Sequence, residues 1–201
     1  TNRGCELIEK YSSDFGSRTD ILYSCLIEQE ENAGPWSSEL FVEKFKIKYL
    51  CTTPNMDMKG IAPSTDLHYM VDREKYHALS QVLPCRIIDH AFFTKIALEI
   101  RCRPTTGFIT IHDILRHNPK QLSIYGFDFY YSGWVSEYKD GMKDKTINQV
   151  LLKTINSKRH IHKNMWMHAK QLLNDPRVSL DDQLKKVLTL DQWWFDSKTQ
   201  I

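Results

Sequence analysis

The chain has 201 residues, and 41% of them are hydrophobic, which is enough for the core of one domain. Its 27 Lys and Arg residues nearly balance 25 Asp and Glu residues, so the net charge of +2 lacks the basic footprint of a nucleic-acid-binding protein. The sequence contains no run of about 18 apolar residues, so it predicts no membrane span, and its first residues lack the pattern of a secretory signal.

The first half of the sequence alternates between apolar stretches of strand type and amphipathic stretches of helix type. Long polar loops are expected at 28–36 and 52–70, and loops of this length in compact domains are often functional. Strands are predicted at residues 19–26, 45–51 and 85–88, and helices at 37–44, 72–82 and from 89 or 90 to about 100.

The second half opens with Pro104-Thr105-Thr106-Gly107, a hydroxyl-and-glycine turn that leads into an amphipathic helix ending near Asn118. A buried strand with a glycine turn and an acid at its end is predicted at 122–129, and residues 130–146 suggest a flexible flap. Further helices are predicted at 147–155, 160–174 and 179–188. This order of elements predicts an α/β fold, with a mostly parallel, Rossmann-like sheet and helices on both faces.

Two of these elements place polar groups where a ligand would bind. Thr105, Thr106 and Gly107 bring hydroxyl and backbone N–H groups to a helix N-terminus, whose partial positive charge suits a phosphate or a carboxylate. Asp128 follows the carboxyl end of a strand, where ligand-binding residues gather in α/β folds. Taken alone, the first motif is equally compatible with an ordinary capped turn.

The sequence has five cysteines, and none of them forms a Cys-x-x-Cys pair, so a zinc site is not expected. Their odd number favours free thiols in a reducing compartment, whereas a lumenal domain would allow one or two disulfides. The five are Cys5, Cys25, Cys51, Cys85 and Cys102.

Taken together, Arg103-Pro104-Thr105-Thr106-Gly107 and Ile124-Tyr125-Gly126-Phe127-Asp128-Phe129 resemble the small sialyl motif of glycosyltransferase family 29, the sialyltransferases. In that family the hydroxyl-and-glycine turn contacts a CMP-sugar donor, and Tyr-Gly-Phe ends the following strand. Thr1-Asn2-Arg3-Gly4 resembles the end of the family's large motif, whose asparagine reaches the nucleotide, and residues 14–21 resemble the segment after it. The resemblance covers roughly residues 2–27 and 84–175.

The resemblance implies one sialyltransferase-like domain over residues 1–201, of the GT-A-like type, that begins just after the family's first nucleotide-binding strand. It implies an inverting, metal-independent transfer of sialic acid or a related acidic sugar from a CMP-sugar co-substrate to a glycan acceptor, with no other cofactor. Family members in animals and plants are usually Golgi proteins, and a viral or bacterial-like member would be cytoplasmic. The donor-binding residues that it implies are Asn2, Thr105, Thr106, Gly107, Gly126 and Asp128.

The catalytic base of this family is a histidine in a short His-x-x-x-Glu motif near the C-terminus. The matching region holds His160 and His162, but Asn164 and Trp166 stand four residues after them, where the family has its glutamate. An unperturbed imidazole, with a pKa of about 6.5, accepts a hydroxyl proton at neutral pH, so either histidine would serve as the base. His162 should lie near the buried stripe of its helix. Metal binding through this His-x-His pair is not expected, because no cysteine or carboxylate is nearby.

Several residues keep an alternative interpretation. Tyr130, Tyr131 and Trp134 would form an aromatic wall for the acceptor sugar, or they would pack within their own loop. His112 and Asp113 are expected to be a packed pair on their helix. The missing glutamate also fits a degenerate family member that acts as a structural or assembly subunit, and the residues expected to dock on its protein partner are Trp193, Trp194 and Phe195.

Overall fold

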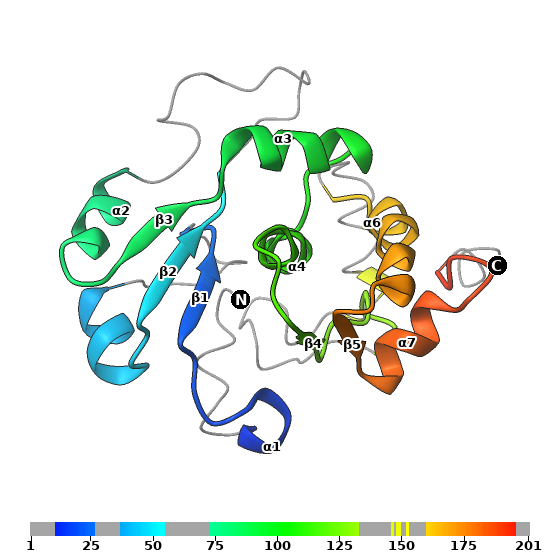
Figure 1. Ribbon diagram of the computed structural model, residues 1–201, viewed down its shortest axis with the longest axis horizontal. Helices are drawn as coiled ribbons and strands as arrows, with labels where there is room; N and C mark the ends of the chain where they lie inside the picture. Colours follow the sequence, from blue (N-terminus) through cyan, green and yellow to red (C-terminus); the bar gives the residue numbers. More distant parts are fainter. Residues whose placement is uncertain are drawn as a thin grey trace.

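The computed structural model describes residues 11–26, 37–54, 73–132, 146, 148–149, 152 and 160–195, and Figure 1 shows how their elements are arranged. Strands and helices alternate along this part of the chain, and each strand pairs in parallel with its neighbours. The predicted α/β class is therefore confirmed, in a mixed form with two small parallel sheets. None of the helices in these ranges combines the length and the apolar content of a membrane span.

The first sheet contains the three strands predicted in the N-terminal half, and the middle one pairs with both of the others. This middle strand begins later than the predicted start at Phe45. The reason is local: the preceding π-helical turn ends with the Phe45 N–H bonded to the Leu40 carbonyl, and Lys46 then has a positive φ of 52°. The three strands are β1 (Ile21–Ser24), β2 (Tyr49–Thr52) and β3 (Cys85–Ile87).

The second sheet joins β4 (Leu122–Ile124) to β5 (Val178–Leu180). The strand predicted to begin at Leu122 is present, and the glycine turn predicted at its end lies at Gly126, which has a φ of 65°. The helix predicted from 179 was wrong at its start, because residues 178–180 form the strand β5. Among the described strands β4 pairs with β5 and not with the first sheet, so the Rossmann-like order stays a prediction.

The helices predicted at 72–82, 89–100 and 106–118 are present. The helix predicted at 160–174 is divided into an α-helical and a 3₁₀ part, and the one predicted at 147–155 lies almost wholly outside the described residues. The helical elements are α1 (Ser12–Phe15), η2 (Glu39–Lys44), α2 (Arg73–Ser80), α3 (His90–Glu99), α4 (Thr106–Arg116), α6 (His162–Ala169), η6 (Lys170–Asn174) and α7 (Asp182–Leu188).

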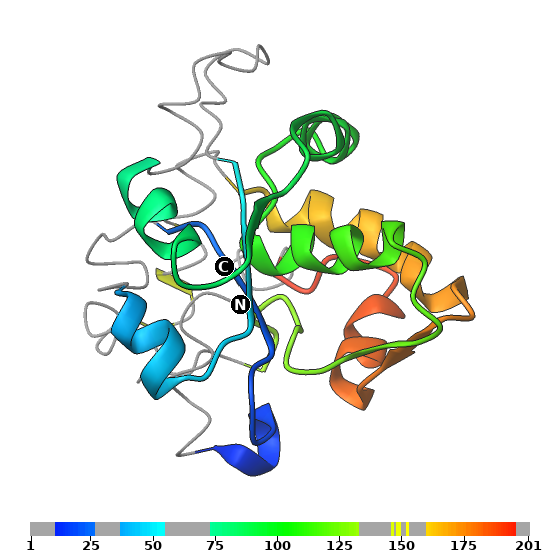
Figure 2. The ribbon, with the colours of Figure 1, turned by 60° about the vertical axis from the view of Figure 1, so that its left-hand side comes forward.

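Successive residues of the first sheet point into two different hydrophobic clusters, as the two-residue period of a strand requires. Leu22 and Leu50 belong to the smaller cluster, which includes residues of η2 and α2. Tyr23 and Cys51 belong to the larger one, which includes residues of α3, α4, α6 and α7. Helix α4 lies between the two sheets in Figure 1 and runs beside α6 in Figure 2, so it is the central helix of the fold.

The aromatic residues near the C-terminus are part of the larger cluster. Trp193, Trp194 and Phe195 are only 4%, 6% and 2% exposed, and the rings of Trp193 and Trp166 lie 5.6 Å apart. The sequence left Trp193 and Trp194 open to a place in the core or at a partner interface, and their burial supports the core. Each of these large aromatic side chains removes much apolar area from water when it packs inside the domain, and this gain favours the core position.

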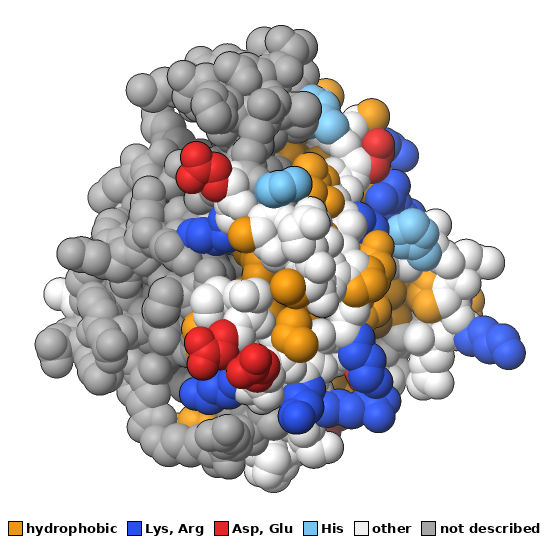
Figure 3. Space-filling model, turned by 90° about the vertical axis from the view of Figure 1, so that its left-hand side faces the viewer, with side chains coloured by type: hydrophobic (Ala, Val, Ile, Leu, Met, Phe, Trp, Pro, Cys, Tyr) orange, Lys and Arg blue, Asp and Glu red, His pale blue; other side chains and the backbone are white. Residues whose placement is uncertain are grey.

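The described surface in Figure 3 carries Lys and Arg side chains and Asp and Glu side chains in small separate groups, with apolar side chains between them. This mixture agrees with the near balance of charges in the sequence. On this face the described residues form no continuous basic stripe of the kind that follows a nucleic-acid backbone.

Candidate functional site

The hydroxyl-and-glycine turn forms the start of α4, as the sequence predicted. Thr105 is its N-cap: the backbone there is extended, and Thr105 Oγ1 accepts a hydrogen bond of 3.3 Å from the Phe108 N–H. Thr105, Thr106 and Gly107 are all partly exposed. The mouth of this helix therefore faces solvent at least in part, with the N–H groups of Thr106 and Gly107 preceding the first helical hydrogen bond.

The two halves of the small motif are in contact. A Cβ atom added to Gly107 would lie 3.1 Å from Cε2 of Phe127, closer than almost all side-chain contacts in proteins. The Phe127 ring in turn packs on Phe129 at 4.9 Å between centroids. A side chain at position 107 would therefore press on the aromatic ring of Phe127, which follows β4, and this close approach favours glycine there.

The segment before the turn is bonded to the start of α6. Asn164 donates from Nδ2 to the Ile100 carbonyl at 2.8 Å, and Cys102 Sγ lies 3.8 Å from the Ile161 carbonyl oxygen. Asn164 stands where the family has its glutamate after His160. Its amide donates to a backbone carbonyl, which a carboxylate cannot do, and this requirement gives a structural reason for asparagine at this position.

His160 is held beside the same segment. Its Nδ1 lies 2.8 Å from the carbonyl oxygen of Arg103, two residues before the Thr105 cap. A carbonyl oxygen only accepts hydrogen bonds, so Nδ1 carries the proton in this contact, and Nε2 is the basic nitrogen of the neutral ring. One of the two predicted imidazoles is therefore adjacent to the mouth of α4.

His162, the first residue of α6, lies in the interior and is 6% exposed. Its ring packs edge-on against Tyr130 at 5.2 Å between centroids. Burial, with a smaller contribution from His160, lowers the pKa of His162 to about 3. The expected position beside the buried stripe of the helix is confirmed, and the ring is neutral near pH 7.

The turn after β4 has a backbone that few side chains adopt. Phe129 and Tyr130 both have positive φ angles, of 54° and 63°, and such conformations store strain that often marks a functional segment. Asp128 closes this turn, because its Oδ2 accepts from the N–H of Ser132 at 2.8 Å and also from the Ser132 hydroxyl. The Gly126 N–H is bonded to Asp181 Oδ2 at 2.8 Å.

Tyr130 and Tyr131, two residues of the expected aromatic wall, pack against different neighbours. Burial raises the pKa of Tyr130 to about 12, and this ring lies against His162. Tyr131 instead packs on Trp194 at 5.6 Å, with Lys186 Nζ 5.3 Å from its ring. The other two predicted site residues, Trp134 and Asn2, lie outside the described residues.

His112 and Asp113 are both buried, as the packed-pair interpretation predicted. Asp113 is fully enclosed and accepts hydrogen bonds from the Tyr23 hydroxyl at 2.8 Å, from Arg116 Nε at 2.8 Å and from Arg86. Burial alone would raise the pKa of Asp113, but its bonds to Arg86 and Tyr23 hold that pKa below its usual value. Arg116 lies one turn further along α4, whereas Tyr23 and Arg86 come from β1 and β3, and no local pattern in the sequence indicated these two partners.

Cys51, Cys85 and Cys102 are thiols, and Cys5 lies outside the described residues. Burial raises the pKa of all three thiols. In the described part of the chain no group of three His, Cys, Asp or Glu residues has the arrangement of a metal site.

Comparison of the chain with protein-family models, with curated proteins and with solved structures found no match.

Proposed function

We propose that this chain is a glycosyltransferase that transfers sialic acid or a related acidic sugar from a CMP-activated donor to a hydroxyl group of a glycan. The observation that carries the proposal is the 2.8 Å contact between His160 Nδ1 and the carbonyl of Arg103, two residues before the Thr105 cap of α4. A basic nitrogen and an anion-binding helix mouth are thereby held next to each other. A transfer from a phosphate leaving group to a hydroxyl requires this pair of groups.

In this proposal the mouth of α4 binds the phosphate of CMP. The N–H groups of Thr106 and Gly107 and the hydroxyls of Thr105 and Thr106 would donate to its oxygens, and the positive end of the helix dipole would stabilise its charge. Gly126, in the turn that follows β4, would contribute backbone to the same pocket.

His160 would be the general base. As the acceptor oxygen attacks the anomeric carbon, Nε2 takes the hydroxyl proton, and the bond from that carbon to the phosphate oxygen breaks. CMP leaves with the bonding electrons, and the configuration at the anomeric carbon inverts. The Arg103 carbonyl would stabilise the imidazolium that forms, because Nδ1–H donates to it.

Burial favours His160 over His162 in this role. A base with a pKa of about 3 has little tendency to take a proton from a hydroxyl at neutral pH, because catalytic efficiency follows basicity. His162 would instead support the Tyr130 side of the pocket through its ring.

A second candidate is a family member that has lost transfer and serves as a structural or assembly subunit. One observation favours it: the residue in the place of the family's glutamate is Asn164, which bonds to the Ile100 backbone instead of to the histidine. The two candidates differ in transfer activity, so a direct assay separates them.

The experiment is a calorimetric titration of the full-length gene product with CMP and with CMP-sialic acid, followed by measurement of CMP release in the presence of glycan acceptors. Saturable CMP binding together with acceptor-dependent release supports the transferase. Binding of CMP without release on any acceptor supports the second candidate. If neither CMP nor CMP-sialic acid binds, the proposed donor site is wrong.

A further inference from the structure

The other end of α4 borders a polar cavity that the proposed transfer does not use. The cavity has a volume of about 610 Å³, within the usual range for small-molecule sites. His112, the cavity residue nearest the start of α4, comes six residues after Thr106, so roughly 9 Å along the helix axis separates the cavity from the proposed donor site. Its polar lining residues come from α4 and from the segment around η6, and they are His112, Arg116, Gln171, Asn174, Asp175 and Arg177.

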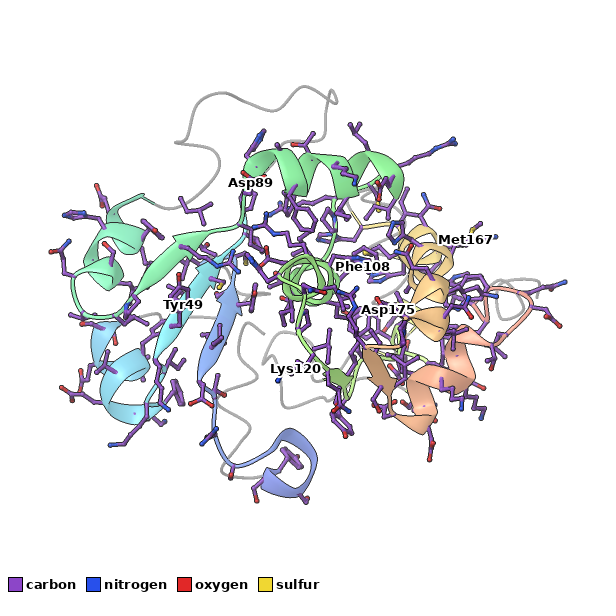
Figure 4. All side chains as sticks on the ribbon, viewed as in Figure 1. Tyr49, Asp89, Phe108, Lys120, Met167 and Asp175 are labelled. Atoms are coloured by element: carbon purple, nitrogen blue, oxygen red, sulfur yellow. The ribbon has the colours of Figure 1, made fainter. Side chains whose placement is uncertain are left out.

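The two arginines of the cavity are more accessible than the carboxylates that pair with them. The Arg116 side chain is 29% exposed and its partner Asp113 is fully buried, with 2.8 Å between Nε and Oδ1. The Arg177 side chain is 32% exposed and that of its partner Asp175 is 20% exposed. Figure 4 labels Asp175, which is drawn beside α4. Each ion pair therefore presents its positive group outward.

Neighbouring groups fix both guanidinium planes in place. Arg177 donates from Nη1 to the carbonyl of Leu115 at 3.2 Å and to Asn118 Oδ1 at 3.2 Å, while its other nitrogens bind Asp175. The bond to Leu115 also offsets the negative end of the α4 dipole. Arg116 stacks over Phe92, with Cζ 4.5 Å from the ring centroid. The Nη1 and Nη2 groups of Arg116 suit two-point recognition of an oxyanion, whereas Arg177, which already uses four of its five N–H groups, can add a single donor from Nη2.

His112 adds a buried polar group to the cavity wall. Its side chain is 8% exposed, and its ring lies between Phe108 and His168, at 4.6 Å and 4.9 Å between centroids. Its Nε2 has no hydrogen-bond partner among the described residues. Buried polar atoms in native proteins are nearly always bonded, so this enclosed nitrogen is an exception within the wall of the cavity.

We propose that this cavity binds the oxyanion group, carboxylate or phosphate, of a small organic anion between Arg116 and Arg177. The proposal is independent of the proposed transferase function, because it rests on residues of the second half of α4 and of the segment around η6, none of which is proposed to bind the donor. The amides of Gln171 and Asn174, at the outer wall of the cavity, would donate to the same group.

The test is an NMR titration of the protein with sodium phosphate and, separately, with sodium citrate, at an ionic strength held constant with sodium chloride. The backbone amide signals of residues 171–175 and of Arg177 are expected to shift in a saturable manner with at least one of the two anions. The anion that binds identifies the group as phosphate or carboxylate. If neither anion gives saturable shifts in this segment, the proposal is overturned.

Two variants and one control localise the site. Asn174→Asp places a negative charge at the exposed rim and should weaken anion affinity by about tenfold. Arg116→Gln should abolish saturable binding. Gln81→Glu makes the same amide-to-acid change at an exposed position after α2 and should leave the affinity unchanged. Equal affinities in Asn174→Asp and Gln81→Glu would overturn the proposal even if Arg116→Gln does not fold.

Discussion

The imidazole Nδ1 of His160 lies 2.8 Å from the backbone carbonyl oxygen of Arg103, although 57 residues separate the two in the sequence. This bond fixes which nitrogen of the ring carries the proton and which is basic. It also distinguishes His160 from His162, whose ring is enclosed and neutral over most of the accessible pH range. The two histidines of one short motif therefore have different expected roles.

The first prediction concerns the base. His160→Asn keeps an amide that can donate to the Arg103 carbonyl but removes the basic nitrogen, so transfer is expected to fall by about 10²- to 10⁴-fold. His162→Phe keeps a buried ring against Tyr130 and is expected to retain activity within about tenfold of the parent. The measurement is the rate of CMP release at pH 7 under saturating donor. The reverse ranking of the two variants would assign the base to His162.

The second prediction concerns the cap of α4. Thr105→Ala removes the acceptor for the Phe108 N–H and should lower the free energy of unfolding by about 1 kcal/mol. Thr105→Ser keeps the hydroxyl and is the matched control, with an expected change of less than about 0.5 kcal/mol. Urea denaturation gives both values. In the proposed function CMP affinity falls in the alanine variant and not in the serine variant.

The third prediction concerns the contact between Gly107 and Phe127. Alanine is favoured over glycine inside a helix by up to about 1 kcal/mol, but here its Cβ would lie 3.1 Å from the Phe127 ring. We expect Gly107→Ala to be more favourable in a Phe127→Leu background than in the parent, with a coupling free energy of about 1 kcal/mol. Chemical denaturation of the four proteins measures this coupling. Additive effects would mean that the ring moves away without cost.

The fourth prediction concerns the buried charge of Asp113. Asp113→Asn leaves Arg86 and Arg116 without their carboxylate and should destabilise the protein by about 3–5 kcal/mol. Tyr23→Phe removes one neutral donor to the same carboxylate and should cost only about 1 kcal/mol. The free energies of unfolding in urea at pH 7 test this difference. Equal losses would show that the ion pairs add nothing beyond the tyrosine bond.

The fifth prediction concerns acid. Burial lowers the pKa of His162 to about 3 and that of His112 to about 4, so both rings are neutral in the folded protein at pH values where the unfolded chain takes up protons. Their contribution to stability is complete above about pH 6.5 and is lost as the pH falls toward the folded pKa values. Each proton that the unfolded chain binds and the folded protein does not lowers the free energy of unfolding by about 1.4 kcal/mol for every pH unit of acidification.

His162→Phe and His112→Phe should each remove one such proton from the slope of unfolding free energy against pH between 6 and 4.5. The slope is informative even where the substitution itself changes stability, because a phenylalanine ring does not titrate. An unchanged slope in the two buried variants would mean that these rings do not titrate below their normal range.

The sequence predicted those elements whose signals are local. The cap of α4 needed only Thr105 and the apolar spacing after it, and the strand at 85–88 needed only the break at Pro84 and the apolar run that follows. The partners of Asp113 were not predictable, because Tyr23 is 90 residues away and their meeting depends on sheet register. β5 was missed because three residues give no strand period and Ser179 resembles a helix cap.

The candidate site was predicted in its parts and not in their arrangement. The turn at Thr105 and both histidines were identified from residue type and spacing, whereas the burial that separates His160 from His162 arises only when Tyr130 packs on α6. Trp193 and Trp194 were left open between the core and a partner interface, because a sequence shows hydrophobicity but does not show which surface covers it.

The hydrogen bonds between residues 160–164 and residues 100–103 also have a consequence for when the two halves of the proposed site meet during synthesis. During synthesis on the ribosome, the helix that begins at Thr106 emerges well before the segment that carries His160. A nascent chain would therefore have the phosphate-binding mouth and lack the base. In the proposed function, catalytic competence would arrive only with roughly the last fifth of the polypeptide, when residues 160–164 pack against residues 100–103.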